Sequence, residues 1–322
     1  MLDVARIEAD QLEPLARAWD EAVDRSDGAD EFCAATVWSF SAASSFPEVE
    51  PPVVLTDGRS FAGMRSQLAE DGTRLLVGLD PIWGFATPAV GHPLVAARLL
   101  DARLRLDDHD LAVVAGQREY GYLLHCLVQV TGERARLLKG PAEQRLQADL
   151  GGGVPAWWAR RSPRFRQRMR QIRDRAEAEG VAVVDCSALP PDEAMDRILA
   201  IEARSWKGRE GTGLAQPDLA EFYRRMAWRL AAADQLRLLV ARRAGQDVGY
   251  ILGGVRARTY RGLQLAYTDD VSALGLGHLL QLHQVEGLQG SGVHTYDMGM
   301  DMAYKRRWAD RVDETFSVLV VT

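Results

Sequence analysis

Three strand-like segments follow one another in the second half of the chain with only short turns between them. They span residues 236–243, 248–256 and 260–268, and a glycine-containing loop, an apolar helix over 278–288 and a strand over 294–300 complete the series. Strand-like runs separated by a few turn residues are typical of hairpins. The order therefore predicts an α/β domain in which a three-strand meander is followed by a helix and a further strand.

The first half of the chain repeats this order loosely. Strand-like segments over 52–55, 61–68 and 73–79 precede a loop that ends at Gly91-His-Pro, a helix over 94–106 and a strand over 110–115. Self-similarity on this scale indicates repeated units. We therefore expect two related α/β domains, each with a mixed, mostly antiparallel sheet flanked by helices.

A structure-breaking stretch predicts where the two domains meet. Gly151-Gly152-Gly153 is followed by Val-Pro, and clusters of glycine and proline interrupt regular structure. A chain of 322 residues is also longer than most single hydrophobic cores. We expect a first domain over residues 1–150 and a second over 151–322.

Charge, cysteine and histidine content narrow the class of protein. The formal net charge is −6, the wrong sign for a general electrostatic attraction to nucleic acid. Cys33, Cys126 and Cys186 are odd in number and far apart, which predicts neither a disulfide framework nor a metal site. Cys126 lies in an apolar run that resembles a buried strand. The histidines show no zinc-ligand spacing, so no metal cofactor is expected.

Hydrophobic runs bear on location. The first eight residues show neither the basic nor the apolar region of a signal peptide. No apolar run reaches the ~18–20 residues that cross a bilayer. These patterns predict a cytoplasmic protein with no membrane span.

Residues 162–180 predict a helix with one apolar stripe. Ser162 suits the cap position, Pro163 the first turn and Gly180 the exit. The stripe repeats at helical spacing through Phe165, Met169, Ile172 and Ala176. Eight arginines crowd the rest, at positions 160, 161, 164, 166, 168, 170, 173 and 175. They form either a solvated face or a surface for phosphates or acidic substrates.

The loop Ser272-Ala-Leu-Gly275-Leu-Gly277 leads from the third strand into the apolar helix. Backbone N–H groups at a helix start attract anions, and glycines allow close approach. A dinucleotide-binding loop would carry a third glycine where Leu280 stands, and no Lys-Ser or Lys-Thr follows, as a P-loop requires. Meander, glycine loop, helix and strand are instead in the order of the GNAT acyltransferase core.

Four pieces of the second half match a known family in order and spacing. They are the helix over 162–180, the segment 202–214 (EARSWKGREGTGL), the loop 272–277 and the segment 297–308 (DMGMDMAYKRRW). With them, residues 160–310 resemble the GNAT acetyltransferases often found beside cellulose-biosynthesis proteins, a branch similar to the Fem-type peptidyltransferases. The resemblance implies two tandem GNAT-like domains, of which the second is catalytic and the first is degenerate. In the first, Pro93 of the counterpart loop removes an N–H donor.

The resemblance also implies a donor site for acetyl-CoA or another acyl-CoA. The pyrophosphate would lie on the amides of Leu274, Gly275, Leu276 and Gly277. The pantetheine would run along the splayed strand that ends at Tyr267 and Thr268. Ser272 and Ala273 depart from the family, whose loop commonly begins with a basic residue.

Acyl transfer needs a base for the nucleophile and an acid for the thiolate. Glu202 is the first candidate base, because Met195, Leu199, Glu202 and Trp206 share a helical stripe and a partly buried carboxylate binds protons more readily. The alternative is a helix-end carboxylate paired with Arg204 or Lys207. Asp297 and Asp301, near the last strand, are further candidates, and Asp297 either faces the site or bonds a neighbouring loop.

The remaining site candidates lie in the two matching segments. Tyr304 is the candidate acid, since GNAT enzymes often use a tyrosine near the thiolate; the alternative is that its ring packs on Trp308. Lys305 and Arg307 are candidates to bind a substrate carboxylate or phosphate. Trp206, Lys207 and Arg209 are candidates for the acceptor side, under a mobile loop that contains Gly208 and Gly211–Gly213.

Three functions stay open at this point. The first is acyl-CoA-dependent N- or O-acylation of a small-molecule or peptide acceptor by direct attack on the thioester. The second is Fem-type transfer from an aminoacyl-tRNA, against which the net charge weighs. The third is a non-catalytic binding protein built on two decayed GNAT folds. The acceptor, the acyl-chain length and the oligomeric state are not predicted.

Overall fold

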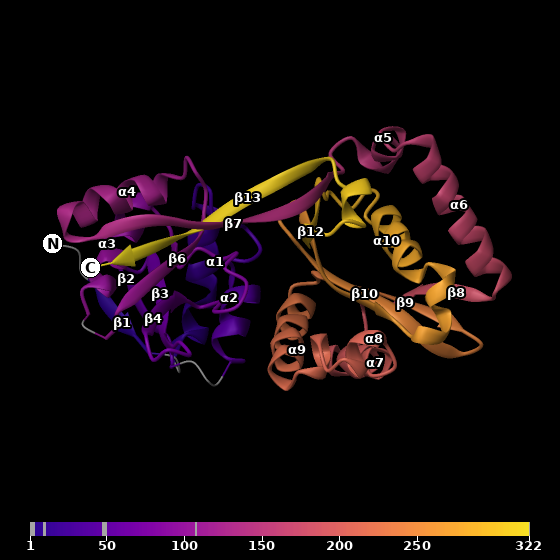
Figure 1. Ribbon diagram of the computed structural model, residues 1–322, viewed down its shortest axis with the longest axis horizontal. Coiled ribbons are helices and arrows are strands. Elements are labelled where there is room, and N and C mark those ends of the chain that lie inside the picture. The colour runs from indigo at the N-terminus through magenta and orange to yellow at the C-terminus, as the bar shows by residue number, and fades with distance from the viewer. Residues whose placement is uncertain (1–3, 9–10, 47–49, 107, 322) are drawn as a thin grey trace. The chain divides into compact units, whose positions relative to one another are not determined.

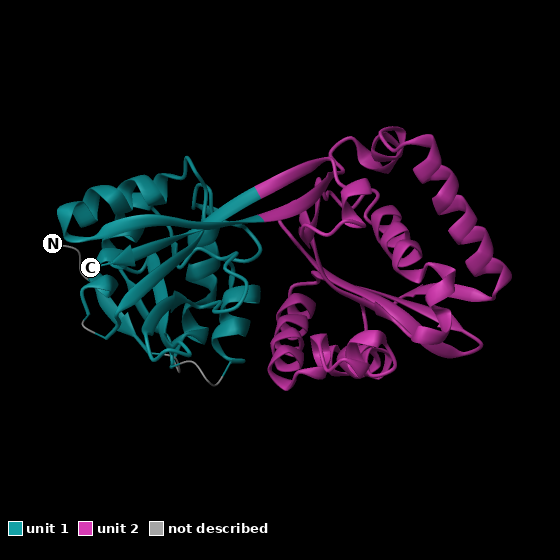
Figure 2. Ribbon diagram, viewed as in Figure 1, with its two compact units in different colours: residues 1–143, 314–322 teal, residues 144–313 magenta. Residues whose placement is uncertain are grey.

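The structure, a computed structural model, describes residues 4–8, 11–46, 50–106 and 108–321. It forms two compact units (Figure 2). Unit 1 comprises residues 1–143 and 314–322, and unit 2 comprises residues 144–313. Within the described part of the chain, no helix is both long and apolar enough to cross a membrane.

The sheet of unit 1 is mixed and mostly antiparallel. Its strands lie in the order β1, β2, β3, β4, β6, β13, with the short β5 paired to β3. β4 and β6 run parallel, and the other neighbouring pairs are antiparallel. The strands are β1 (Ala5–Ile7), β2 (Val53–Thr56), β3 (Phe61–Leu68), β4 (Arg74–Gly78), β5 (Ala89–Val90), β6 (Leu111–Gln117) and β13 (Arg311–Val321).

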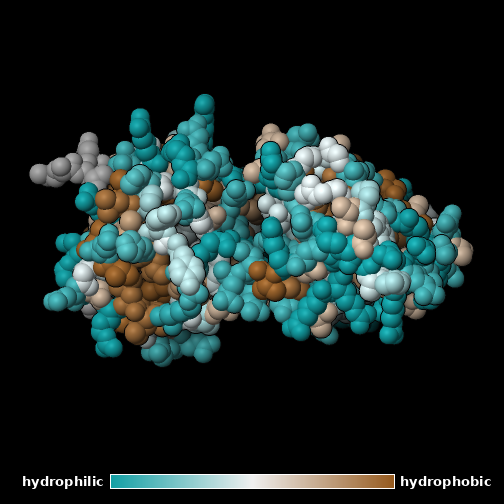
Figure 3. Space-filling view, turned by 90° about the horizontal axis from the view of Figure 1, so that it is seen from above, coloured by the Kyte–Doolittle hydropathy of each residue, from teal (hydrophilic) through white to brown (hydrophobic). Residues whose placement is uncertain are grey.

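Four helices accompany this sheet: α1 (Ala16–Asp24), α2 (Thr36–Ala43), α3 (Pro93–Leu104) and α4 (Tyr122–Thr131). The expectation of a strand around Cys126 is wrong, because that residue lies in α4. The run around Cys126 is apolar without alternation, a pattern that periodicity alone cannot divide between helix and strand. Figure 3 shows apolar side chains gathered on the side of unit 1 where α4 lies, and Tyr122 and Val128 of α4 are exposed.

The strands of unit 2 belong to the same 13-stranded sheet and form its second mixed, mostly antiparallel part, which we call the second sheet. Its order is β7, β12, β11, β10, β9, β8. β11 and β12 run parallel, while β8, β9, β10 and β11 form an antiparallel series. The strands are β7 (Arg136–Asp149), β8 (Val181–Asp185), β9 (Leu236–Arg243), β10 (Gln246–Arg256), β11 (Thr259–Tyr267) and β12 (Thr295–Met300).

Helices cover both faces of the second sheet (Figure 1). α6 and α10 lie on one face, and α7, α8 and α9 lie on the other. The helices of unit 2 are α5 (Gly153–Ala159), α6 (Pro163–Ala178), α7 (Pro191–Glu202), α8 (Trp206–Arg209), α9 (Pro217–Ala232) and α10 (Leu276–Gly287). The predicted cap of α6 is present, since the Phe165 N–H donates to Ser162 Oγ over 3.2 Å.

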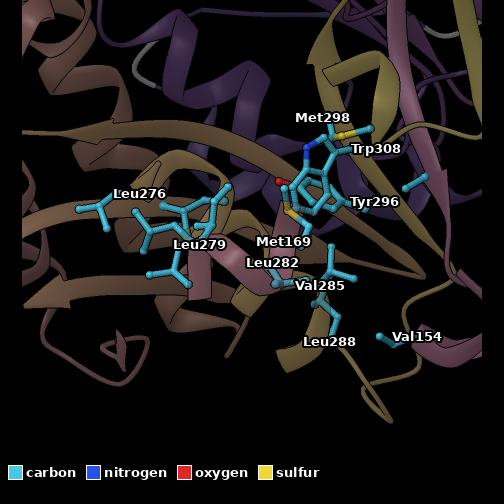
Figure 4. Packing of buried hydrophobic residues seen from close by; sticks show 14 of the residues in the cluster. Val154, Met169, Leu276, Leu279, Leu282, Val285, Leu288, Tyr296, Met298 and Trp308 are labelled. Carbon is cyan, nitrogen blue, oxygen red and sulfur yellow. The ribbon is translucent and has the colours of Figure 1, made fainter. Parts of the chain in front are cut away.

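The core of unit 2 fixes α10 against the sheet. Figure 4 shows Leu279, Leu282 and Val285 of α10 close to Met169 of α6 and to Tyr296 and Met298 of β12. Each buried aliphatic side chain of this size contributes about 1.5–3 kcal/mol. The position of the α10 start therefore follows from the packing behind it.

The predicted order of elements is found in both units. In unit 1 the antiparallel strands β2, β3 and β4 precede α3 and then β6, which is parallel to β4. In unit 2 β9, β10 and β11 precede α10 and then β12, which is parallel to β11. The boundaries shift by one to two residues from those expected, as fraying at element ends leads one to anticipate.

The division of the chain differs from a single cut near residue 150. β7 and β13 each run from one unit into the other, so the compact units divide at 143/144 and again at 313/314. Gly151–Gly153 ends β7 and starts α5 inside unit 2, with Gly153 at φ +79°. The glycines therefore make a turn within unit 2, and the chain crosses between units in a strand.

Candidate functional site

β11 and β12 part shortly after they begin. They pair in parallel over three residue pairs, which join Thr259–Arg261 to Thr295–Asp297, and no further pairing links their described residues. We call residues 262–267 of β11 and 298–300 of β12 the strand fork. A side chain at Gly262 would place its Cβ 3.1 Å from the Tyr296 ring. Glycine therefore lets the strands separate beside a buried tyrosine.

The start of α10 packs against β11, one arm of the strand fork. Gly275 has φ +75°, a left-handed conformation that suits glycine, and the helix begins at Leu276. A Cβ on Gly277 would lie 3.3 Å from Tyr267 Cε1 and 3.4 Å from Leu265 Cδ2. The first N–H groups of a helix have no partner inside the helix. The Gly275–Gly277 turn is thus an anion-attracting helix start packed against β11.

The predicted contributors to this turn are not equivalent. Leu274 and Leu276 are buried, so these residues anchor the turn in the core of unit 2. Tyr267 packs against Gly277. Thr268 is buried and its N–H donates to Val248 O over 2.9 Å. Thr268 therefore closes the end of β11 and does not project into the fork.

Arginines of α6 lie beside the α10 start. Arg175 donates to Ala273 O over 3.1 Å. Burial lowers the pKa of His278, in the first turn of α10, and the charges of Arg168 and Arg307 lower it further. Three arginines therefore place positive charge near the turn, although Ser272 in the loop is uncharged.

Asp297 is held between two arginines at the base of the fork. Its Oδ2 lies 2.6 Å from Arg261 Nη1 and 3.1 Å from Arg145 Nη1, and all three side chains are buried. Its Oδ1 accepts the Gly299 N–H over 2.8 Å. Asp313 adds a second carboxylate to Arg145 at 2.7 Å. The two alternatives for Asp297 were that it faces the site or that it bonds a neighbouring loop. Both of its carboxylate oxygens are bonded to neighbouring residues, which matches the second alternative.

Glu202 ends α7 as a buried carboxylate. Its Oε2 accepts the Tyr250 hydroxyl over 2.8 Å, and its Oε1 accepts the Leu214 N–H over 3.2 Å. Lys207 Nζ lies 3.9 Å from Oε1. Burial, with the Glu202 charge, raises the pKa of Tyr250 well above its ordinary value, so Tyr250 stays a donor. The paired alternative for Glu202 matches this geometry, with Lys207 as the cation.

Lys207 reaches the open edge of β11. Its Nζ donates to Gln264 Oε1 over 2.8 Å and to Leu265 O over 3.1 Å. Burial lowers the pKa of Lys207, while the Glu202 charge acts in the opposite direction. The segment that carries it is ordered into α8 and a 3₁₀ turn at Gly213–Ala215. The mobility expected of this loop stays a prediction.

Lys305 reaches the other arm of the fork. Its Nζ donates to Met298 O over 2.7 Å and to Met300 O over 3.2 Å. Burial lowers its pKa to about 8, and the charges of Arg261 and Lys207 contribute to the shift. The charge of Lys207 therefore acts on Lys305 across the fork.

The other predicted residues surround this centre. The Tyr304 ring lies 6.5 Å from the His278 ring, edge to face. Burial, and then Tyr267, raise the pKa of Tyr304. Arg307 is exposed. The expected helical stripe ends at Glu202, because Trp206 starts α8 and is 44% exposed.

Three residues of the site lie outside the predicted set. Arg145 on β7, Tyr250 on β10 and Arg261 on β11 hold the two carboxylates. Each stands in a strand with ordinary patterning, and only Arg261 has a weak signal, a charge between Tyr260 and Gly262 in an apolar strand. Long-range pairing of this kind leaves no local sequence pattern.

In unit 1 the matching helix start is closed by its own chain. The Gly91 N–H donates to Ser26 Oγ over 2.6 Å, and the His92 N–H donates to Ser60 Oγ over 3.2 Å. Pro93, the first residue of α3, has no N–H. Backbone atoms of Phe85 and Ala86 lie 2.7 Å from a Cβ built on Gly116, so a loop fills the space beside β6. Among the described residues, no group of three or more His, Cys, Asp or Glu is arranged to hold a metal ion.

Comparisons with known proteins find a family match within unit 2. Residues 163–306 match the family described as the acetyltransferase (GNAT) domain. No curated protein matches the sequence.

Solved structures share the fold along nearly the whole chain. FemX has a TM-score of 0.65 at 10% identity, covering 94% of this chain and 95% of its own. A C-terminal domain assigned to a lysylphosphatidylglycerol synthetase from Agrobacterium fabrum has a TM-score of 0.62 at 13% identity, with 96% and 92% covered. A tandem GNAT protein from the clavulanic acid biosynthesis pathway has a TM-score of 0.50 at 13% identity, with 99% and 98% covered. The predicted fold class is confirmed.

Proposed function

We propose that the GNAT acetyltransferase domain of residues 163–306 makes this chain an acyl-CoA-dependent acyltransferase with its site in unit 2. The observation that carries the proposal is the helix start at Gly275–Gly277, packed against β11 where that strand leaves β12. The narrower placement beside cellulose-biosynthesis proteins stays a prediction. The acceptor is proposed to be a small molecule or a peptide, acylated on nitrogen or oxygen.

The donor is proposed to bind with its pyrophosphate on the amides of the Gly275–Gly277 turn. One helix start contributes about 0.3–1 kcal/mol when exposed and up to about 2 when partly buried, so further cations are needed. Arg168, Arg175 and Arg307 are proposed to supply them, because Arg175 bonds Ala273 of the loop and the charges of Arg168 and Arg307 act on His278 in the first turn of α10. This supports the sharper of the two interpretations of the arginine-rich helix, and it compensates for the uncharged Ser272.

The proposed reaction is direct attack of the acceptor on the thioester. The nucleophile loses a proton to a base, and the thiolate gains one from an acid. Glu202, Asp297 and Asp301 are the sequence candidates for the base, but Glu202 binds two donors and Asp297 three. Asp301 pairs with Arg306 over 2.8 Å. We therefore assign the base to Lys305, whose pKa of about 8 is close to a working pH. Tyr304, next to the α10 start, remains the proposed acid.

The donor site is tested by binding, because binding does not require the acceptor. A ligand at ~100 times its dissociation constant adds ~2.7 kcal/mol to the native state. We expect CoA, acetyl-CoA or a longer acyl-CoA to raise the melting temperature of the wild-type chain. Gly277→Asp should abolish the shift, since it puts a carboxylate where phosphate would lie.

Gly287→Asp is the matched control. Gly287 ends the same helix, and a Cβ there meets no atom within 4 Å, so this variant should keep the ligand shift. No shift with any thioester in the wild type would overturn the proposal. Salt-sensitive stabilisation by an aminoacyl-tRNA in its place would favour the Fem-type alternative.

A further inference from the structure

Lysine is rare in this chain, and two of its three lysines lie at the strand fork. Of the 39 lysine and arginine residues, only Lys139, Lys207 and Lys305 are lysines. Arginine presents five donors on a rigid plane, whereas lysine presents a compact ammonium that exchanges its proton more readily. Almost all other basic residues of the chain are arginines. The strand fork instead has one lysine on each arm, Lys207 at β11 and Lys305 at β12.

The segment that carries Lys207 is shaped by close contacts. A Cβ on Gly208 would lie 2.5 Å from Glu202 O, and a Cβ on Gly213 would lie 2.6 Å from Glu202 Oε1. Gly213 also lies against the Lys207 chain, with its built Cβ 3.1 Å from Lys207 Cδ. The Thr212 N–H donates to Lys207 O over 2.9 Å. Both glycines and Glu202 thus hold the backbone and the stem of one lysine.

The Lys207 ammonium has donor capacity left for a ligand. An ammonium carries three N–H donors. Gln264 Oε1 and Leu265 O accept two of them, and the Glu202 carboxylate at 3.9 Å is beyond hydrogen-bond distance. Gln264 is itself fixed, since its Nε2 donates to Tyr223 OH over 3.1 Å. The ammonium is therefore held at the unpaired edge of β11 with one N–H to offer.

We propose that Lys207 is a catalytic residue whose free N–H donates a hydrogen bond to the oxyanion that forms from the acyl carbonyl oxygen of the donor. The inference rests on the proposed function. The acceptor nucleophile forms a bond to the carbonyl carbon, and the π electrons move to the oxygen, which becomes an oxyanion. The oxyanion then collapses, the carbon–sulfur bond breaks, and CoA leaves as a thiolate that takes a proton. Lys207 keeps its proton throughout and stabilises the oxyanion.

Glu202 acts in this scheme as a positioning residue. It anchors the Gly213–Ala215 turn through the Leu214 N–H. Its negative charge also favours the protonated form of Lys207, which the reaction needs. A buried carboxylate next to a buried ammonium therefore keeps a donor charged where burial alone would favour its neutral form.

The test measures donor binding and turnover separately. Thiol release from the acyl-CoA that gives the largest thermal shift is followed, with water or an added primary amine as the nucleophile. Lys207→Met should bind this acyl-CoA within about threefold of wild type, while kcat falls about 10²–10³-fold, the usual effect of losing one oxyanion donor. Lys139→Met is the matched control, because Lys139 lies in unit 1, where it pairs with Glu119 at the surface and lies over the Phe316 ring, and its kcat should be unchanged.

A second variant tests the pH dependence of turnover, which would not change if Glu202 had a purely structural role. Turnover should fall at high pH as Lys207 loses its proton. Glu202→Gln keeps the side-chain shape and removes the charge that raises the Lys207 pKa, so the alkaline fall should shift to lower pH. An unmoved alkaline limb would overturn the role given to Glu202 and Lys207.

The outcomes separate this inference from the proposed function. If wild-type protein binds no acyl-CoA, the proposed function fails first. If the wild type binds and Lys207→Met retains kcat within threefold, the proposed function stands and the inference fails. Loss of acyl-CoA affinity in Lys207→Met would also overturn it, because Lys207 would then bind the ground state.

Discussion

The pKa values and charges of side chains at the strand fork depend on burial and on neighbouring charges. Asp297 contacts two arginines, so its charge is neutralised inside the fold. Lys305 stands near Arg261 and Lys207, and its pKa falls to about 8, mainly through burial. Removing one member of a buried pair typically costs about 3–5 kcal/mol, because the other charge is left without a partner. Asp297 is therefore expected to stabilise the fork, while Lys305 is free to exchange a proton.

The Lys305 assignment predicts a pH dependence. A base works in its neutral form, and the neutral amine increases as the pH rises through about 8. Turnover at saturating acyl-CoA should therefore rise with pH around 8. Lys305→Arg keeps the positive charge but cannot deprotonate, so its rate should be low and should lack this rise. The same rise in Lys305→Arg would instead assign the titration to the acceptor.

The segment 205–214 shows how a short element acquires a fixed shape. Its contacts include the hydrogen bond from the Leu214 N–H to Glu202 and the close approaches of Gly208 and Gly213 to Glu202. Gly211 and Gly213 both have positive φ, at +66° and +60°. They differ in their surroundings, since a Cβ on Gly211 meets no atom within 4 Å and one on Gly213 meets Glu202 Oε1.

This difference allows a paired prediction. Gly211→Ala should cost about 1–2 kcal/mol of unfolding free energy, because alanine is strained in the left-handed conformation. Gly213→Ala should cost more than that and should also lower turnover, since its methyl group displaces the Glu202 carboxylate and the Lys207 stem. Urea unfolding and thiol release measure the two effects. Equal losses in both variants would mean that Glu202 does not depend on Gly213.

Local patterns in the sequence were sufficient to predict the elements around the site. The meander of β9, β10 and β11, the α6 cap at Ser162 and the helix after Gly277 were predicted because turns, caps and periodicity are local signals. The helix around Cys126 was mistaken for a strand, because a short apolar run fits both periods.

The site was predictable only in part, for a physical reason. The Gly275–Gly277 turn has a recognisable spacing, and Lys207 and Lys305 were named as candidates. The bonds that decide their chemistry join residues far apart, such as Arg145 with Asp297 and Glu202 with Tyr250. The sequence carries no register between β7 and β12, so these partners appear only in the fold.

At the scale of the whole molecule, the two repeats exchange strands. β7 follows β6 in the chain but pairs with β12 in unit 2, at Ala148 and Tyr296 for example. β13 follows β12 but pairs with β6 in unit 1, at Val318 and Val114. Each sheet is therefore completed by a strand that the other repeat supplies in sequence. A single domain boundary near residue 150 would therefore separate β7 from β12, the strand with which it pairs.

Strand exchange predicts which fragments fold. A fragment of residues 144–313 keeps the part of β7 that brings Arg145, Leu146 and Ala148 into the core of unit 2. A fragment of residues 151–322 lacks them, and it leaves Asp297 without Arg145. That pair alone is worth about 3–5 kcal/mol when one partner is removed, against a typical total of about 5–15 kcal/mol. We expect cooperative thermal unfolding by circular dichroism from the first fragment and none from the second. If both fragments unfold cooperatively at similar temperatures, unit 2 does not need β7 to fold. A domain boundary near residue 150 would then describe the chain correctly.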